Sequence, residues 1–69
     1  MSAADQLLVT LLALLPKDGT PVTVAALAKA AGISQPAVTN TLFAPWFAGR
    51  LGYDLRTDSY FAIRTGDTL

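Results

Sequence analysis

The chain has 69 residues, of which 52% are hydrophobic, and its five basic and five acidic side chains give zero net charge. It contains neither cysteine nor histidine, which excludes a disulfide framework. Its acidic residues are five scattered aspartates, so the chain offers neither a set of metal ligands nor a catalytic constellation. We therefore expect one small domain that is stabilised by apolar burial, binds no cofactor and is not an enzyme.

The first expected element is a helix over residues 3–15, capped by Ser2 and ended by Pro16. Leucines at helical spacing form one apolar stripe on it: Leu8, Leu11, Leu12 and Leu15. Most other positions are apolar too. Because a helix that is hydrophobic nearly all round is either deeply buried or shared between two chains, we expect a homodimer through this helix, with Leu7 and Leu14 at the interface. The alternative is a well-buried helix that leaves Leu7 or Leu14 in water.

No membrane segment is expected. The longest apolar run, residues 11–15 behind residues 7–9, is too short to span a bilayer. Asp5 stands where a signal peptide would carry a basic residue, and no cleavage-like site follows. The sequence therefore predicts a soluble cytoplasmic protein, associated with the nucleoid if it binds DNA.

Residues 24–44 are expected to form two helices with a tight turn between them. Thr23 and Ser34 are typical N-caps, and Gly32 is typical of the left-handed residue that ends a helix. Two helices that cross steeply require small, flexible or apolar residues at certain positions, which are occupied here by Ala28, Gly32, Ile33, Val38 and Leu42. The pattern predicts a helix-turn-helix.

The second helix of this unit has a polar outward face and an aromatic end. Its expected outward residues are Gln35, Thr39 and Asn40, and its inward ones are Val38, Thr41 and Leu42. Pro45 disfavours a helical conformation at Ala44, so the helix should end or kink there. Most aromatic residues of the chain are expected in the core. Trp46 and Phe47 are adjacent and cannot easily both point inward, so one of them is expected at a surface for a protein partner.

The last third of the chain alternates apolar with polar or small residues, which is typical of strands: first Leu51, Tyr53 and Leu55, then Phe61 and Ile63. Both apolar faces point the same way if Leu55 lies opposite Phe61. This register requires a three-residue loop at 57–59, with Asp58 or Ser59 in the left-handed conformation. The remaining expected elements are a hairpin over about 50–64, a very short strand near 20–22 and a frayed tail at 65–69.

This order of elements resembles the winged-helix family over residues 5–64, with Gly49, Arg50 and Leu51 entering the hairpin. Residues 34–39 look like the start of the recognition helix in MarR-type regulators, and the size is similar to that of single-domain regulators of bacterial pilus operons. The resemblance implies a mainly α fold with a small antiparallel β-hairpin, and a DNA-binding transcriptional regulator of bacteria or phage. It also assigns residues to the DNA: Ser34, Gln35, Thr39 and Asn40 to the major groove, and Arg56 and Thr57 to the wing tip.

The chemistry of these residues suits duplex DNA. Gln35 and Asn40 can read adenine through paired hydrogen bonds, and Thr39 can contact a thymine methyl group. The candidate phosphate contacts are Lys29, Arg50 and Arg56. Two or three such contacts per chain give weak binding, and a dimer doubles their number. Because the dimer is expected to form through the apolar first helix, DNA binding is expected to depend on that helix.

A winged-helix protein–protein interaction module is the alternative hypothesis. The chain is neutral, and residues 34–49 contain no lysine or arginine. A neutral domain with surplus apolar surface suits a protein partner better than nucleic acid. An adaptor, or a phage or mobile-element protein that binds a host factor without binding DNA, fits the same pattern.

Overall fold

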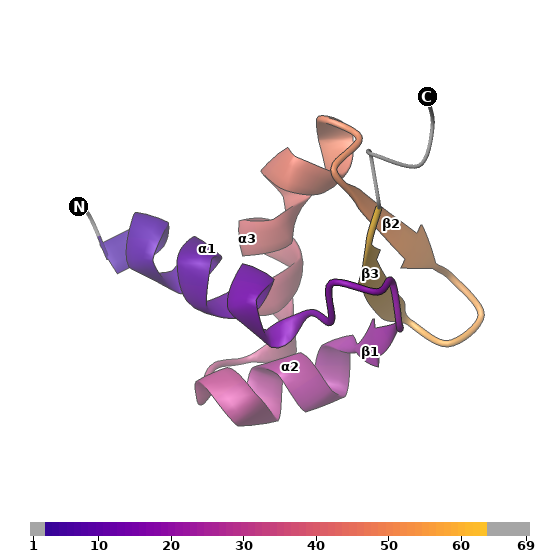
Figure 1. Cartoon of the computed structure of the whole chain (residues 1–69). Coiled ribbons are helices and arrows are strands. Elements are labelled where there is room, and N and C mark those ends of the chain that lie inside the picture. Colours follow the sequence, from indigo (N-terminus) through magenta and orange to yellow (C-terminus); the bar gives the residue numbers. More distant parts are fainter. Residues whose placement is uncertain (1–2, 64–69) are drawn as a thin grey trace.

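Three helices and a small antiparallel sheet make up the chain in the computed structural model, which describes residues 3–63 (Figure 1). The elements are α1 (Ala3–Leu14), β1 (Val22–Thr23), α2 (Val24–Ala31), α3 (Gln35–Phe47), β2 (Leu51–Asp54) and β3 (Ser59–Ala62). The sheet order is β1-β3-β2. The expected mainly helical class with a small antiparallel sheet is confirmed. The expected Ser2 cap and the frayed tail at 65–69 lie outside the described residues.

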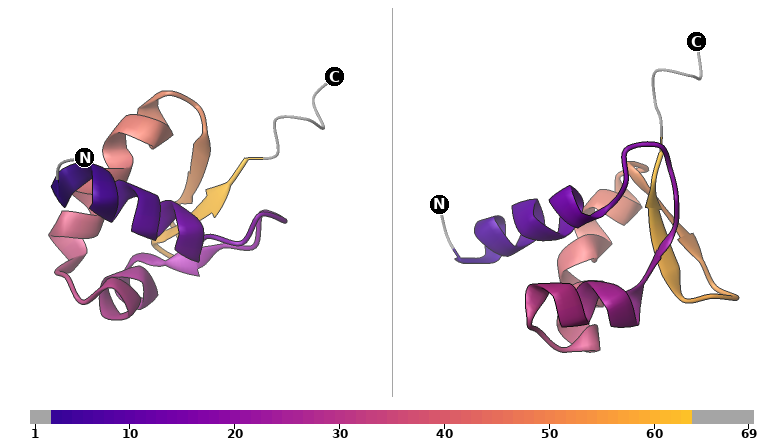
Figure 2. Two further views of the ribbon diagram at one scale, coloured as in Figure 1. Left: turned by 60° about the vertical axis from the view of Figure 1, so that its left-hand side comes forward. Right: turned by 60° about the horizontal axis from the view of Figure 1, so that its bottom comes forward.

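The three helices pack around one core, and the sheet lies at one side of them (Figure 2). The largest fully buried side chains come from all three helices: Leu11, Val24, Leu27, Val38 and Leu42. Leu51 of β2 and Tyr60 of β3 complete this core, each with 5% of its surface exposed. No helix in the described part of the chain is long and apolar enough to cross a membrane.

α1 turns most of the predicted leucine stripe inward. Leu11 and Leu15 are buried, and Leu8 packs partly buried against the core, as does Leu7. Residues four apart lie on one side of a helix, so the inward side that α1 turns to α2 and α3 centres on Leu11 and includes Leu7. Leu12 lies about 100° further round the helix axis and is 38% exposed, so it is the member of the stripe that lies outside the core.

The turn between α2 and α3 forms as the sequence predicts. The Thr23 hydroxyl accepts a hydrogen bond from the Ala26 N–H (3.1 Å), and the Ser34 hydroxyl accepts one from the Ala37 N–H (3.2 Å). Gly32 ends α2 in the left-handed conformation, with φ of 71°. These local interactions satisfy N–H groups that have no partner inside their helices.

α3 continues through Pro45, so of the two predicted outcomes at Ala44, an end or a kink, the end is wrong. Pro45 is buried, and the burial of its ring offsets the hydrogen bond that its missing N–H cannot make. The helix ends instead at Phe47, with Ala48 as its C-cap, and Gly49 follows in the left-handed conformation with a φ of 79°. There the Arg50 N–H donates to the Pro45 carbonyl (2.9 Å) and the Gly49 N–H donates to the Trp46 carbonyl (3.0 Å). This arrangement is a Schellman motif.

The hairpin pairs in a register other than the predicted one. Phe61, expected opposite Leu55, lies opposite Gly52, and Leu55 is 81% exposed in the loop. The new register differs by an odd number of residues, so Tyr60 instead of Phe61 turns to the core. Gly52 makes room for the displaced ring, because a Cβ at this position would lie 2.1 Å from the Phe61 ring. The predicted inward Ile63 is likewise 39% exposed.

The hairpin loop spans residues 55–58, one residue more than predicted. Asp54 stabilises its start by accepting a hydrogen bond from the Arg56 N–H (2.9 Å). Asp58 adopts the predicted left-handed conformation, with φ of 53°, and its carboxylate accepts a hydrogen bond from the Tyr53 hydroxyl. Aspartates at both ends therefore hold the loop.

This contact makes the stability of the domain sensitive to alkaline pH. The hydrogen bond to Asp58 raises the pKa of Tyr53 from 10.0 to about 12, and burial raises the pKa of Tyr60. Because the folded pKa values exceed the unfolded value, this stabilisation is complete below pH 10 and is lost as the pH rises through about 12. We expect the midpoint of thermal unfolding, followed by circular dichroism, to fall over this range and to fall less in a Tyr53→Phe variant. An equal decline in both proteins would contradict the assignment.

Candidate nucleic-acid interface

The first half of α3 presents polar side chains to solvent. Gln35, Thr39 and Asn40 are exposed, whereas Val38 and Leu42 on the other side of the helix are completely buried. The Thr39 hydroxyl donates within the helix to the Gln35 carbonyl (3.3 Å). Within residues 3–63 the amide groups of Gln35 and Asn40 form no hydrogen bond, so they remain available to a ligand. The predicted outward face is therefore exposed, and Ser34 at its start is exposed too.

Two of the predicted cations lie at exposed positions. Lys29 is exposed in the last turn of α2, directly before the turn that leads into α3. Arg56 lies in the hairpin loop with its side chain 92% exposed, and its Nε is 3.8 Å from a carboxylate oxygen of Asp54. At this exposure and distance the ion pair contributes little, so the guanidinium can exchange it for a phosphate. Thr57, beside Arg56, donates its hydroxyl to Ser59 (2.9 Å).

The segments that carry these groups lie in the lower part of Figure 1, on opposite sides of the molecule. The α2–α3 turn lies at the left and the hairpin loop at the right. The Val24 N–H at the start of α2 donates to the Asp58 carbonyl of the hairpin loop (2.8 Å), whereas Lys29 is in the last turn of α2. The start of α3 lies at the lower end of that helix in Figure 1, and its last turn lies at the upper end.

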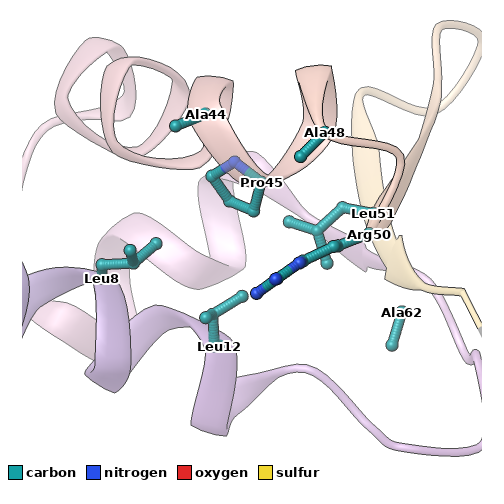
Figure 3. A pocket seen from close by; sticks show the side chains of 8 residues that line it. All are labelled: Leu8, Leu12, Ala44, Pro45, Ala48, Arg50, Leu51 and Ala62. Carbon is teal, nitrogen blue, oxygen red and sulfur yellow. The ribbon is translucent and has the colours of Figure 1, made fainter.

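Arg50 is not near the start of α3. It follows α3, a helix of 13 residues that is about 20 Å long, whereas Gln35 begins that helix. Figure 3 shows its guanidinium across the mouth of a pocket and directed toward Leu12 of α1. The pocket has a volume of about 470 Å³ and is otherwise apolar, lined by Leu8, Leu12, Ala44, Pro45, Ala48, Arg50, Leu51 and Ala62.

The second half of α3 exposes three aromatic side chains, which we call the aromatic cluster: Phe43, Trp46 and Phe47, with 56%, 43% and 77% of their surfaces exposed. The centroid of the Phe43 ring lies 5.9 Å from those of Trp46 and Phe47. Among the six aromatic residues only Tyr60 is buried, so the prediction that most belong to the core is wrong. The inward positions here are taken by Leu42 and Pro45, which leaves the cluster outside.

Phe43 belongs to this surface although only Trp46 or Phe47 was expected there. A helix that continues through Pro45 places residues 43, 46 and 47 close together, at spacings of three and four. The spacing of these three residues in the sequence therefore indicates the cluster, provided that the helix does not end at Ala44. The partner surface expected at Trp46 or Phe47 includes both residues.

The two α1 residues predicted at a dimer interface differ in exposure. Leu7 is partly buried against the core, and Leu14 is 37% exposed. The other large apolar side chains that α1 exposes are Val9 (56%) and Leu12 (38%). The apolar surface of α1 is thus wider than the predicted pair and extends to the pocket wall.

Comparisons with known proteins add no family to this description. No protein-family model matches the chain, and no curated protein or solved structure is significantly similar to it. The features that bear on function are the exposed polar face of α3, the exposed cations Lys29 and Arg56, and the aromatic cluster.

Proposed function

We propose that the chain is a winged-helix transcriptional regulator that binds duplex DNA as a dimer, with the first half of α3 in the major groove and the hairpin loop on the backbone. The main support is the exposed polar face of α3, where Gln35 and Asn40 have free amide groups. Buried Val38 and Leu42 hold this helix to the core, so its outward side chains are presented in fixed positions. Glutamine and asparagine amides suit the donor and acceptor pair of adenine in the major groove.

The exposed cations of α2 and of the hairpin loop supply the part of the binding that does not depend on DNA sequence. Lys29 and Arg56 give two phosphate contacts per chain, and each contact releases condensed counterions. The logarithm of the binding constant should therefore fall with the logarithm of the salt concentration with a slope of about −2 for one chain and about −4 for a dimer. Arg50 is left out of this estimate because it lies at the far end of α3, over the apolar pocket.

Fluorescence anisotropy with labelled duplexes at increasing salt tests the proposal. Lys29→Ala and Arg56→Ala should each weaken binding on every duplex alike and reduce the salt slope of one chain by about 1. Lys17→Ala, which removes an exposed cation from the turn after α1, is the matched control and should leave the slope unchanged.

Duplexes selected from a random pool test base recognition separately. Gln35→Ala or Asn40→Ala should reduce the preference for selected over random duplexes by about 1–3 kcal/mol, with non-specific binding retained. A folded protein that binds no duplex at low salt would overturn the proposed function.

The aromatic cluster favours a second candidate, a winged-helix module that binds another protein. Its three side chains are large and exposed, the Phe43 ring lies beside both of the others, and α3 carries no cation. Exposed aromatic groups of this kind are enriched at the centres of protein interfaces. Absence of duplex binding, together with loss of a protein partner in a Phe47→Ser variant, is the result this candidate predicts.

A further inference from the structure

The aromatic cluster and the pocket beneath Arg50 are neighbours on one face of the molecule. Phe43 and Phe47 project from α3 on one side of Ala44 and Ala48, and these two alanines form a wall of the pocket. In Figure 3, Leu8 and Leu12 of α1 form the facing wall. We call this surface the α1–α3 face, and it consists of Leu8, Leu12, Phe43, Ala44, Phe47 and Ala48. An aromatic ridge therefore lies directly beside an apolar hollow.

We infer that the α1–α3 face binds the same face of a second copy of this chain, with the Phe47 ring of each copy in the pocket of the other. Phe47 is the most exposed member of the aromatic cluster, at 77%, and the pocket of about 470 Å³ is larger than one phenyl ring. A ridge and a hollow side by side are self-complementary under a two-fold axis. Ala44 and Ala48 lie one helical turn apart, and their small side chains allow a second helix to approach closely.

The charges near this face favour a second copy over a strongly charged partner. The chain has zero net charge, so two copies do not repel each other. Asp5 and Arg50 lie toward opposite ends of the hollows between α1 and α3: Asp5 lines a smaller one with Leu8 and Asn40, and Arg50 lines the larger one. A two-fold axis through the alanines reverses this order in the second copy. Each Arg50 is then directed toward the Asp5 end of its partner.

The apolar area of this face is small for a dimer interface. At about 200 Å² per aromatic side chain, the exposed parts of Phe43 and Phe47 amount to roughly 270 Å². Leu12, with 38% of its surface exposed, and the exposed Ala44 and Ala48 add to this area. Specific interfaces bury about 600–1,000 Å² on each partner, so polar residues around the face supply the rest, and we expect weak association with a dissociation constant on the order of 100 micromolar.

This dimer differs from the one expected from the sequence, because α1 contributes Leu8 and Leu12 instead of Leu7 and Leu14. It rests on the proposed function only in supplying the second set of phosphate contacts, and the association itself requires no DNA. Of the polar residues in the first half of α3, Gln35 and Thr39 lie outside the α1–α3 face, whereas Asn40 lines the smaller hollow beside Leu8 and therefore borders this face.

Sedimentation equilibrium without DNA, over about 1–500 micromolar protein, tests the inference. The wild type should associate reversibly, and Phe47→Ser and Ala48→Arg should each weaken association at least tenfold. Leu14→Ser changes an apolar residue outside the face that is 37% exposed, and it is the control, which should associate like the wild type. Circular dichroism verifies that each variant is folded.

Two features of the chain give independent readouts. Trp46 is the only tryptophan and is 43% exposed beside the proposed interface, so its emission should shift to shorter wavelength as the wild-type concentration rises. The chain has no cysteine, so an Ala48→Cys variant should form a disulfide-linked dimer on mild oxidation, whereas Thr57→Cys in the hairpin loop should not.

A wild type that stays monomeric throughout the concentration range would overturn the inference. So would a dimer that is weakened by Leu14→Ser but not by Phe47→Ser, since it would use another face of α1. Duplex binding without self-association would remove this inference and leave the proposed DNA contacts of each chain intact. Self-association without duplex binding would do the reverse.

Discussion

Replacing Leu42 with alanine is expected to lower the free energy of unfolding by about 2–5 kcal/mol and to leave much of the domain unfolded at physiological temperature. Leu42 is completely buried in α3, which packs against α1, α2 and β2. The substitution removes apolar contacts and leaves a cavity at the centre of the core. A domain this small rarely has more than about 3–5 kcal/mol of stability, so one such cavity consumes most of it.

Urea unfolding followed by circular dichroism measures this loss, with Leu12→Ala as the matched control. Leu12 has the same side chain but is 38% exposed on α1, so its truncation should cost about 1 kcal/mol or less. The comparison also tests which face of α1 is buried. Equal losses in the two variants would show that Leu12 belongs to the core.

Gly32→Ala is expected to lower the free energy of unfolding by about 1–2 kcal/mol through the backbone alone. Gly32 has a φ of 71°, and an added Cβ would meet nothing within 4 Å, so neither a clash nor lost packing contributes. The conformation positions two closing hydrogen bonds: from the Gly32 N–H to the Lys29 carbonyl (3.3 Å) and from the Ile33 N–H to the Ala28 carbonyl (3.0 Å). These bonds set the angle at which α3 leaves α2.

Gly49 offers a matched site for the same measurement. It follows the C-cap of α3 and has a φ of 79° and equally open surroundings, so Gly49→Ala should cost as much as Gly32→Ala. Asparagine tolerates the left-handed conformation better than alanine, and Gly32→Asn should therefore retain more of the stability. If urea unfolding ranks asparagine below alanine at this position, the cost does not arise from φ.

The helix ends could be predicted because each depends on residues that are close in sequence. Thr23 and Ser34 cap their helices because each hydroxyl accepts a hydrogen bond from the N–H group three residues further along the chain. The polar face of α3 follows from the same local logic. Once Val38 and Leu42 point inward, helical periodicity turns Gln35 and Asn40 outward, and the structure places them there.

The errors concern interactions between distant segments. β3 lies between β1 and β2, and Tyr60 pairs with Val22 on one side and with Tyr53 on the other. The alternation in the hairpin alone cannot reveal this second neighbour, so the predicted register of Phe61 was chosen without it. The position of Arg50 over the pocket depends in the same way on α1, which lies far away in the sequence.

The sequence by itself determined where α2 and α3 begin, where α2 ends and which side of α3 is polar, because capping, left-handed glycines and helical periodicity act over a few residues. Only the tertiary structure decided which face of α1 is buried, how the hairpin pairs and that Pro45 stays inside α3. Each of these outcomes depends on burial against segments distant in the chain, and such burial outweighs local preferences of about 1–3 kcal/mol. The exposed aromatic cluster follows from the same competition, since Pro45 takes the buried position and leaves Trp46 and Phe47 at the surface.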